Sequence, residues 1–332
     1  MAKRINPAKA LLWRNATDVQ LGIENPLILR DVTPEDERLL NLLQRGIPDD
    51  SVTEAQKNLI ERIAPALVDF GVVKKPRLSH EFMQGAFAEL IKASFATDRD
   101  GVSVLEARAG VTVQLDSLGN GGLLLARGLA AAGVGRIISE DSNRVTAQEV
   151  NPLGYRKIQT GMPRIEAAQQ LLSESHSAMR LDHLAGLTPA KRKHLLKVLI
   201  TGSAIDPRRF RELVDRNLPH LCVFFEPGRV SVSPVISSSA CLGCLDLERT
   251  ETDPAWPAIA SQVIGRVDYL EDARSALFAA AMVVGEVLRA IDSPERERDF
   301  VGHRLDVVSG RVTEWSWPRR LDCYCAGSAA RI

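Results

Sequence analysis

The sequence lacks an excess of charge of either sign and any histidine pattern typical of a metal or nucleophile site. Lysine plus arginine and aspartate plus glutamate number 42 each, so no net field favours nucleic acid or an anionic membrane as a partner. The six histidines are scattered without ligand spacing, and none stands in a nucleophile motif beside serine or cysteine. These absences direct attention to the glycine-rich and cysteine-containing segments.

The sequence also lacks a segment typical of export or membrane insertion. The N-terminal stretch MAKRINPAK is not followed by an apolar h-region, and the most apolar later run, residues 276–284, is too short to span a bilayer. Apolar residues make up 45% and charged residues 25% of the chain, a balance typical of soluble globular proteins. We therefore expect a cytoplasmic protein.

The length of 332 residues is enough for two domains with ordinary cores. The pattern changes at Pro76, which predicts a small domain over residues 1–76 and a larger one over residues 77–332. The first has the order of elements of a winged helix, with strands expected at residues 11–14, 19–23 and 27–30. Thr33 and Thr53 predict two helix starts, and residues 65–70 are expected as a third, short helix.

A winged helix suggests DNA binding, but the charge of this one argues against it. Residues 54–70 carry only two basic side chains, Lys57 and Arg62, against three acidic ones. A small sheet with a free edge beside a helix can instead accept an extended peptide as an added strand. A docking or dimerisation module fits the pattern equally well, so both interpretations stay open.

Residues 111–145 organise the second domain. An apolar, β-branched run is followed by small residues, a helix-length apolar segment, a second apolar run and the acidic Asp141. This order is required by a nucleotide-binding βαβ unit, in which glycines let a phosphate approach the helix N-terminus and the acid binds a ribose. The small residues are Ser117, Gly119, Gly121 and Gly122. Ser117 stands where the usual fingerprint has its first glycine, so a fold unit that binds no ligand is an equal alternative.

The rest of the second domain alternates between helix and strand lengths. Strands are expected within residues 101–113 and at 197–201, 221–225 and 229–236, and helices at 79–96, 123–132, 163–172 and 207–214. Such alternation predicts a doubly wound, mostly parallel sheet with helices on both faces. The expected fold class is therefore α/β and Rossmann-like, preceded by a small α+β winged-helix domain.

Four of the five cysteines form two pairs, Cys241 with Cys244 and Cys323 with Cys325. Four thiolates in two pairs match a tetrahedral structural zinc site, which leaves no open position for a catalytic water. A redox CxxC motif or unrelated free thiols are the alternatives. Cys222 lies in an apolar run and is expected in the core.

Residues 118–145, the sequence GMPR at 161–164 and the paired cysteines resemble the ThiF and MoeB type of adenylating protein, whose fold is shared with ubiquitin-activating enzymes. The segment SACLGCLDLERTETDPAWP and the CYC tail are similar to ThiF-like proteins of bacterial thiazole/oxazole-modified peptide clusters, often labelled bacteriocin-biosynthesis cyclodehydratases. In that group the N-terminal part is a peptide-recognition winged helix similar to PqqD, and the segment ALLWRNATDVQLGIENPLIL fits its strands.

This resemblance implies a precursor leader peptide bound on the third strand and the neighbouring helix, a YcaO-type partner that performs the ATP-dependent ring closure, and a homodimer. The implied peptide-binding residues are Leu27, Ile28, Leu29, Arg30, Leu59 and Ile63. The resemblance also places ATP and magnesium beside Gly119, Gly121, Gly122, Asp141 and Arg164. Arg164 stands where the family usually has a lysine.

The chain departs from the family around the triphosphate. Glu149 and Pro152 occupy the places where adenylating members carry an asparagine and an arginine, so the first adds a negative charge and the second removes a donor. Near the family's magnesium-binding aspartate the chain reads ITGS at residues 200–203, and the nearest acid is Asp206. We therefore expect a retained fold around an unreactive pocket.

The sequence predicts a non-catalytic scaffold, a degenerate adenylyltransferase that has no catalytic residues, binds a leader peptide and presents it to a partner enzyme, with zinc in a structural role. The rival interpretation is an active ATP-dependent adenylyltransferase that uses Asp141, Arg164 and Asp206 to activate a peptide or carrier-protein carboxylate. A third is a transcription factor with a DNA-binding winged helix and a small-molecule sensor domain.

Overall fold

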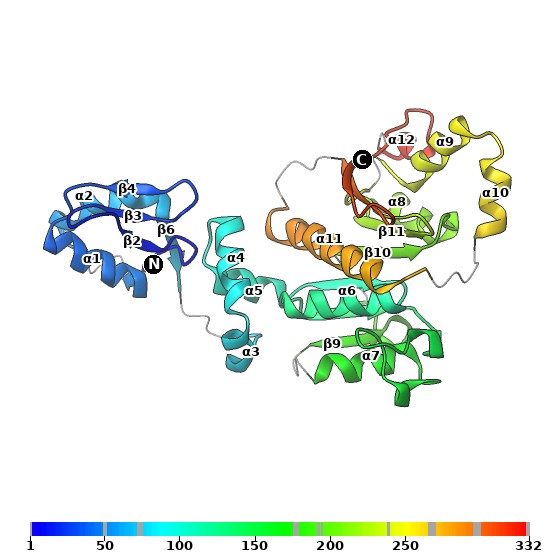
Figure 1. Cartoon of the computed structure of the whole chain (residues 1–332), viewed down its shortest axis with the longest axis horizontal. Coiled ribbons are helices and arrows are strands. Elements are labelled where there is room, and N and C mark those ends of the chain that lie inside the picture. The colour runs from blue at the N-terminus through cyan, green and yellow to red at the C-terminus, as the bar shows by residue number, and fades with distance from the viewer. Residues whose placement is uncertain are drawn as a thin grey trace. The chain divides into compact units, whose positions relative to one another are not determined.

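The structure, a computed structural model, describes residues 2–48, 52–71, 76–174, 179–190, 193, 195–237, 240–264, 270–294 and 300–329. The chain forms two compact units, Met1–Gly110 and Val111–Ile332, and each has its own core (Figure 1). Among the described residues, no helix combines the length and the apolar character that a bilayer crossing requires.

The first unit contains two small antiparallel sheets. The three predicted strands form one of them in the order β2 (Leu11–Trp13), β3 (Val19–Leu21), β4 (Leu27–Leu29). The second sheet has the order β5 (Ile47–Pro48), β1 (Ala2–Ile5), β6 (Leu67–Phe70). Side chains that alternate along β3 and β4 bury Val19, Leu21 and Leu29 against the helices.

Two helices cover the inner side of the first sheet, α1 (Pro34–Arg45) and α2 (Glu54–Ile63). Thr33 and Asp36 form a reciprocal capping box at the start of α1, and Thr53 starts α2 in the same way. The expected third helix at residues 65–70 is wrong. Pro65 lies in a 3-10 turn, η2 (Ala64–Ala66), and the next four residues pair with β1 as strand β6, a partner more than sixty positions away.

The helix expected over residues 79–96 is two helices, α3 (His80–Gly85) and α4 (Phe87–Thr97), separated at Ala86. The strands expected within residues 101–113 are corrected to a helix, α5 (Gly101–Arg108), and the strand β7 (Thr112–Leu115). The carboxylate of Asp100 accepts the Ser103 N–H at 3.2 Å and so caps α5. Residues 72–73, expected to follow the winged helix, lie outside the described residues.

The second unit contains an eight-stranded sheet in the order β14-β13-β12-β11-β10-β7-β8-β9. Five neighbours are parallel, namely β11 (His220–Glu226), β10 (Leu196–Thr201), β7, β8 (Arg136–Ser139) and β9 (Arg180–His183). Three antiparallel strands extend one edge, namely β12 (Arg229–Val232), β13 (Val301–Asp306) and β14 (Val312–Ser316). The prediction of an α/β fold with a mostly parallel, doubly wound sheet is confirmed.

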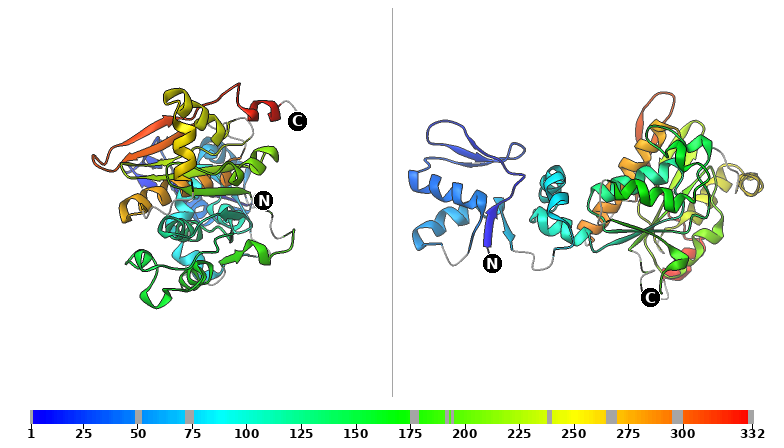
Figure 2. Two further views of the ribbon diagram at one scale, coloured as in Figure 1. Left: turned by 90° about the vertical axis from the view of Figure 1, so that its right-hand side faces the viewer. Right: turned by 90° about the horizontal axis from the view of Figure 1, so that it is seen from below.

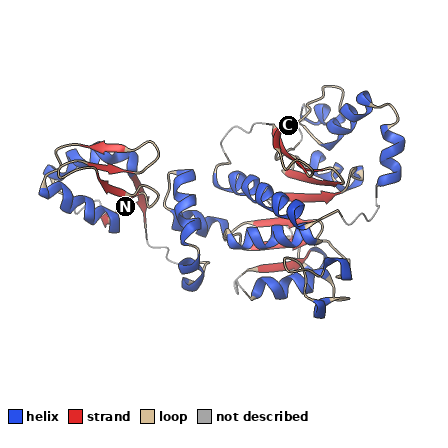
Figure 3. Ribbon diagram, viewed as in Figure 1, coloured by secondary structure: helices blue, strands red, loops and turns tan. Residues whose placement is uncertain are grey.

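Helices cover both faces of this sheet, as Figures 2 and 3 show. One core lies between the sheet and α6 (Asn120–Ala131), α7 (Arg164–Ser173) and α11 (Ala273–Asp292). The other lies against α8 (Arg211–Asp215) and α9 (Leu242–Thr252) and contains Cys222, as expected. The remaining elements are η3 (Ala147–Glu149), η4 (Lys157–Gln159), η5 (Leu184–Gly186), η6 (Pro207–Arg209), α10 (Trp256–Val263) and α12 (Tyr324–Ala329).

Two predicted elements of this unit are shorter than expected. The helix expected at residues 207–214 is the 3-10 turn η6 followed by the short α8. The strand expected at residues 229–236 ends at Val232, and Pro234, which has no N–H to donate to a ladder, follows closely. The hairpin of β13 and β14 was not anticipated.

Candidate functional site

The candidate nucleotide site lies in the turn between β7 and α6. Gly119 is the N-cap residue of α6, and Gly121 and Gly122 lie in its first turn. A Cβ atom on Gly122 would lie 2.1 Å from the carbonyl oxygen of Ser117, a backbone atom that cannot move aside. The glycine at this position is therefore explained by the close approach of the helix to the preceding turn.

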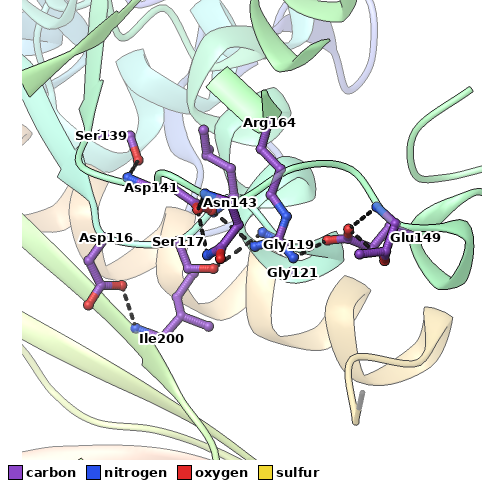
Figure 4. A network of polar contacts seen from close by, with 12 residues as sticks. Asp116, Ser117, Gly119, Gly121, Ser139, Asp141, Asn143, Glu149, Arg164 and Ile200 are labelled. Atoms are coloured by element: carbon purple, nitrogen blue, oxygen red, sulfur yellow. Dashed lines mark hydrogen bonds and ion pairs between the residues drawn. The ribbon is translucent and has the colours of Figure 1, made fainter. Parts of the chain in front are cut away.

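Side chains of the protein itself bond the backbone N–H groups of this turn. The Leu118 N–H donates to Asp141 Oδ2 at 2.7 Å, and the Gly121 N–H donates to Glu271 Oε2 at 2.6 Å. The Gly119 N–H lies 3.3 Å from Ser117 Oγ. Figure 4 shows the turn together with Asp141 and Arg164. An N-terminal helix turn attracts anions through such N–H groups, and here two carboxylates of the chain already serve as the anions.

Arg164, at the start of α7, is held between two acids. Its Nη1 lies 3.1 Å from Asp141 Oδ2 and its Nη2 lies 2.8 Å from Glu149 Oε1, and only 12% of the side chain is exposed. Burial by itself lowers the pKa of this guanidinium, but the charges of Asp141 and Glu149 outweigh burial and raise the pKa above its ordinary value. The charge of the Arg164 guanidinium is thus balanced by a carboxylate on each side.

The two acids are themselves fixed by further bonds. Glu149 accepts hydrogen bonds from the Thr146 N–H at 2.8 Å and from its hydroxyl at 2.9 Å, which caps η3. Asp141 accepts from the Asn143 N–H at 2.8 Å. Both side chains are almost fully buried, so moving either to admit a ligand would break several hydrogen bonds at once.

Glu271 is the residue of this site that the sequence did not reveal. It lies just before α11, 150 positions from the glycine that it contacts, and burial raises the pKa of its carboxyl group above the ordinary value. The cavity beside it, lined also by Asn120 and Asn151, has a volume of about 20 Å³. This is room for about one water molecule, whereas small-molecule sites enclose roughly 300–1,000 Å³.

Tyr155 is a second residue that the sequence did not reveal, and its side chain contacts the backbone of the turn. Its hydroxyl donates to the Leu118 carbonyl oxygen at 2.7 Å, and the ring is buried. Burial raises the pKa of Tyr155 well above its usual value, so the hydroxyl keeps its proton and remains a donor. No motif marks this residue in the sequence, because its contact depends on how the loop after η3 folds back.

The neighbouring strand end carries a separate ion pair. The Ile200 N–H donates to Asp116 Oδ1 at 2.9 Å, and the guanidinium of Arg209 contacts both the Asp116 carboxylate and, at 2.8 Å, the Ile200 carbonyl oxygen. Asp206, the nearest acid to the family's magnesium position, caps η6 and pairs with Arg208. The hydrogen bond and ion pair of Arg208 lower the pKa of Asp206.

The four paired cysteines form one buried cluster. Cys241 Sγ lies 3.6 Å from Cys323 Sγ, Cys244 Sγ lies 3.5 Å from Cys325 Sγ, and all four sulfur atoms lie within 4.8 Å of one another. None of them forms a disulfide. Four sulfur ligands about 2.3 Å from a tetrahedral zinc ion lie roughly 3.8 Å apart, so the donor set and its spacing fit a metal of this kind. The cluster joins α9 to the C-terminal segment.

The residues implied for peptide binding divide into two groups. Leu29, Leu59 and Ile63 lie in the core of the first unit and are at most 4% exposed, so their side chains are not accessible to a ligand. Ile28 is 43% exposed, and Arg30 is also exposed. Leu27 is partly buried. β4 lies at one edge of its sheet, and among the described residues it pairs with β3 alone.

No family model matches the chain, and no curated protein matches it in sequence. Solved structures match it over almost its whole length. The microcin C7 biosynthetic enzyme MccB in complex with N-formylated MccA has a TM-score of 0.64 at 12% identity, and the match covers 98% of this chain and 100% of that chain. MccB of E. coli with ATP has a TM-score of 0.65 at 13% identity, with 98% and 100% covered.

A second protein, PaaA, has a TM-score of 0.62 at 17% identity, and the match covers 79% of this chain and 90% of that chain. At such identities the likeness concerns the fold. The chain has the ThiF-like α/β fold that the sequence predicted.

Proposed function

We propose that this protein is a non-catalytic ThiF-like scaffold that binds a peptide and presents it to a partner enzyme. The observation that carries the proposal is the filled phosphate position. Glu271 accepts the Gly121 N–H, Asp141 accepts the Leu118 N–H, and Arg164 is paired with two acids. Proteins of this fold usually activate carboxylates with ATP. This chain keeps the fold, but the N–H groups that would bind an anion are hydrogen-bonded to its own side chains.

Electrostatics support this conclusion. Transfer from ATP needs free donors and cations around the triphosphate, where negative charge develops. Here the carboxyl groups of Asp141, Glu149 and Glu271 lie near one guanidinium, and the cavity beside Glu271 has a volume of about 20 Å³. A triphosphate placed beside them would meet like charges and would have to displace buried hydrogen bonds.

The peptide part of the proposal rests on the first unit and on the neighbours in fold. MccB has been solved with MccA and related peptides, so this overall fold accommodates a peptide ligand in that protein. The open edge of β4 offers main-chain groups to an extended strand. By resemblance, we assign the first unit as PqqD-like, the ligand as a precursor leader peptide, and the partner as a YcaO-type cyclodehydratase of thiazole/oxazole-modified peptide biosynthesis, with the scaffold acting as a homodimer.

Zinc in the four-cysteine cluster would have a structural role. Cys241, Cys244, Cys323 and Cys325 would hold it, and a full set of four thiolates leaves no position for a reacting water. The metal would join the C-terminal segment to α9 and contribute no chemistry.

A working adenylyltransferase is the second candidate, because Asp141 and Arg164 lie side by side on a fold that in MccB has been solved with ATP. ATP–pyrophosphate exchange separates the two. We expect no exchange above background for the wild type with any peptide supplied. Exchange that disappears in Arg164→Ala would overturn the scaffold proposal.

A gain-of-binding variant tests the filled phosphate position directly. Glu271→Ala frees the Gly121 N–H and removes the carboxyl group that occupies it, so we expect at least tenfold, about 1.4 kcal/mol, tighter binding of a fluorescent ATP analogue than the wild type shows. Glu286→Ala, within the α11 helix that follows Glu271 and paired with Arg289, is the matched control. Equal affinity of the wild type and Glu271→Ala would mean that Glu271 does not occupy the anion position.

A further inference from the structure

The outer face of the first sheet carries two cross-strand rows of side chains. Leu12, Gln20 and Ile28 stand directly opposite one another in the registers of β2, β3 and β4. Arg14, Asp18 and Arg30 line the same groove, which has a volume of about 670 Å³. Leu12 is 39% and Ile28 is 43% exposed, although both are large aliphatic side chains. A row with two exposed aliphatic side chains beside a row of charged side chains is a surface that can select the side chains of an adjacent strand.

The main-chain bonds of this sheet decide which edge residue can accept another strand. The Arg14 N–H donates to the Asp18 carbonyl at 2.8 Å, and the Gly22 N–H donates to the Ala10 carbonyl at 2.9 Å. Both pairs are in register with β2 and β3. Because hydrogen-bonded pairs recur at every second residue of an antiparallel ladder, Gln20 also directs its N–H and C=O toward β2.

The main-chain N–H and C=O groups of successive residues in β3 point alternately toward β2 and toward β4. Val19 and Leu21 direct their main-chain groups toward Leu29 and Leu27 of β4. Ile28, between these two, directs its N–H and C=O away from β3 to the open edge, while its side chain stands on the outer face. A strand added at this edge would therefore form a hydrogen-bonded pair with Ile28, and the side chain of the paired residue would lie beside that of Ile28 on the outer face.

The charges next to Ile28 are unbalanced in favour of arginine. Asp18 is the one carboxylate that lines the groove, against the two guanidiniums of Arg14 and Arg30. Arg14 is engaged by Gln20 Oε1 at 2.6 Å, and Asp18 by Asn15 at 3.0 Å. The hydrogen bond from Asn15 is the main cause that lowers the pKa of Asp18, and the charge of Arg30 contributes, so one carboxylate faces two guanidiniums in this groove. On an added strand, the residue two positions from the one beside Ile28 would lie beside Arg30. A negative side chain is favoured there.

We propose that the outer face selects peptides in which an aliphatic residue and a carboxylate residue stand two positions apart, the first beside Ile28 and the second beside Arg30. This inference rests on the proposed capture of a peptide strand at β4 and names the side chains that are selected there. The spacing of two follows from the alternation of side chains along a strand, and the added strand runs antiparallel to β4, the direction in which the residue opposite Ile28 exchanges both main-chain hydrogen bonds with it.

The test uses the full chain and synthetic peptides. The probes are fluorescein-labelled peptides of about eight residues, the length of an ordinary strand, with threonine throughout except for one leucine and one glutamate two positions apart, in either order. Fluorescence anisotropy measures their affinity. We expect the exchange of glutamate for lysine in the peptide, or Arg30→Glu in the protein, to weaken binding about fivefold, and the two changes together to restore it.

Two controls separate side-chain selection from peptide capture itself. Arg38→Glu makes the same charge reversal on the exposed side of α1 and should leave every affinity unchanged. N-methylation of the peptide leucine removes the donor that pairs with Ile28 and should abolish binding whatever the charge of the neighbours. Circular dichroism of Arg30→Glu verifies that the variant is folded.

The outcomes are distinguishable. If peptides bind but the charge swap gives no rescue, the selection proposed here is wrong while peptide capture stands. If no peptide of any sequence binds the wild type, peptide capture itself is overturned. If Ile28→Asp changes the oligomeric state in analytical ultracentrifugation and leaves peptide affinity unchanged, the face is an interface between copies of this chain and the proposal fails.

Discussion

At the scale of single residues, we propose that buried charge limits what the glycine turn between β7 and α6 can bind. Glu271, Asp141 and Glu149 occupy the donors and the cation that an incoming triphosphate would need. A site with a few N–H donors and one guanidinium can balance a limited number of negative charges. A further anion would be repelled.

His220 gives a residue-scale prediction for pH. It is fully buried at the start of β11, Nδ1 lies 2.9 Å from the Leu218 carbonyl, and burial lowers the pKa of the ring from 6.5 to about 4. As the pH falls from 6.5 toward 4, the ring of His220 takes up a proton in the unfolded chain but not in the folded chain. The free energy of unfolding therefore falls by up to roughly 3 kcal/mol.

Urea unfolding of the wild type and of His220→Leu at several pH values tests this. The variant has no ring to protonate, so its stability should fall less steeply over the same interval. Identical slopes for the two proteins would show that His220 is not the group responsible.

At the scale of elements, turns and caps decide where helices start and how closely they approach the sheet. The capping boxes at Thr33 and Thr53 fix the starts of α1 and α2 at the positions that the sequence indicates. The approach of α6 to β7 depends in contrast on the absence of a side chain at Gly122, which only the geometry of the turn explains.

Gly122→Ala and Gly285→Ala form a matched pair at this scale. A Cβ at Gly122 would meet the Ser117 carbonyl, so we expect Gly122→Ala to cost roughly 2 kcal/mol or more. Gly285 lies exposed within α11 with no atom within 4 Å of a built Cβ, so Gly285→Ala should stabilise by about 1 kcal/mol. Chemical denaturation measures both. A stabilising Gly122→Ala would contradict the close approach of α6.

At the scale of the whole molecule, two compact units with separate cores make up the chain. The cysteine cluster belongs to the second unit, where it links α9 with the C-terminal segment. Energy gained by binding a metal in this cluster would contribute to the stability of that unit, because all four cysteines lie in it.

Metal removal tests this division. Purified protein should contain about one zinc per chain, and a strong chelator should lower the melting transition of the second unit while that of the first unit stays in place. Cys241→Ser should release the metal. Cys222→Ala, a change at the buried cysteine outside the cluster, is the control and should retain it. A chain that holds no metal and melts identically with and without chelator would contradict a metal centre.

The sequence by itself determined the local features of this protein. Turn residues, caps and alternation gave the strands β2, β3 and β4, the helices α1 and α2 and the alternation of strands and helices in the second unit, because these patterns depend on neighbours a few positions apart. The spacing of the cysteines in the sequence likewise indicated a four-cysteine cluster.

Only the tertiary structure decided the contacts between distant segments. Residues 67–70 became a strand because β1 offered a partner, and the glycine turn is filled because Glu271 reaches it from 150 positions away. The sequence pattern in both places is compatible with another outcome. Long-range hydrogen bonds determine the outcome in both places, because their energy depends on which groups meet in the folded chain.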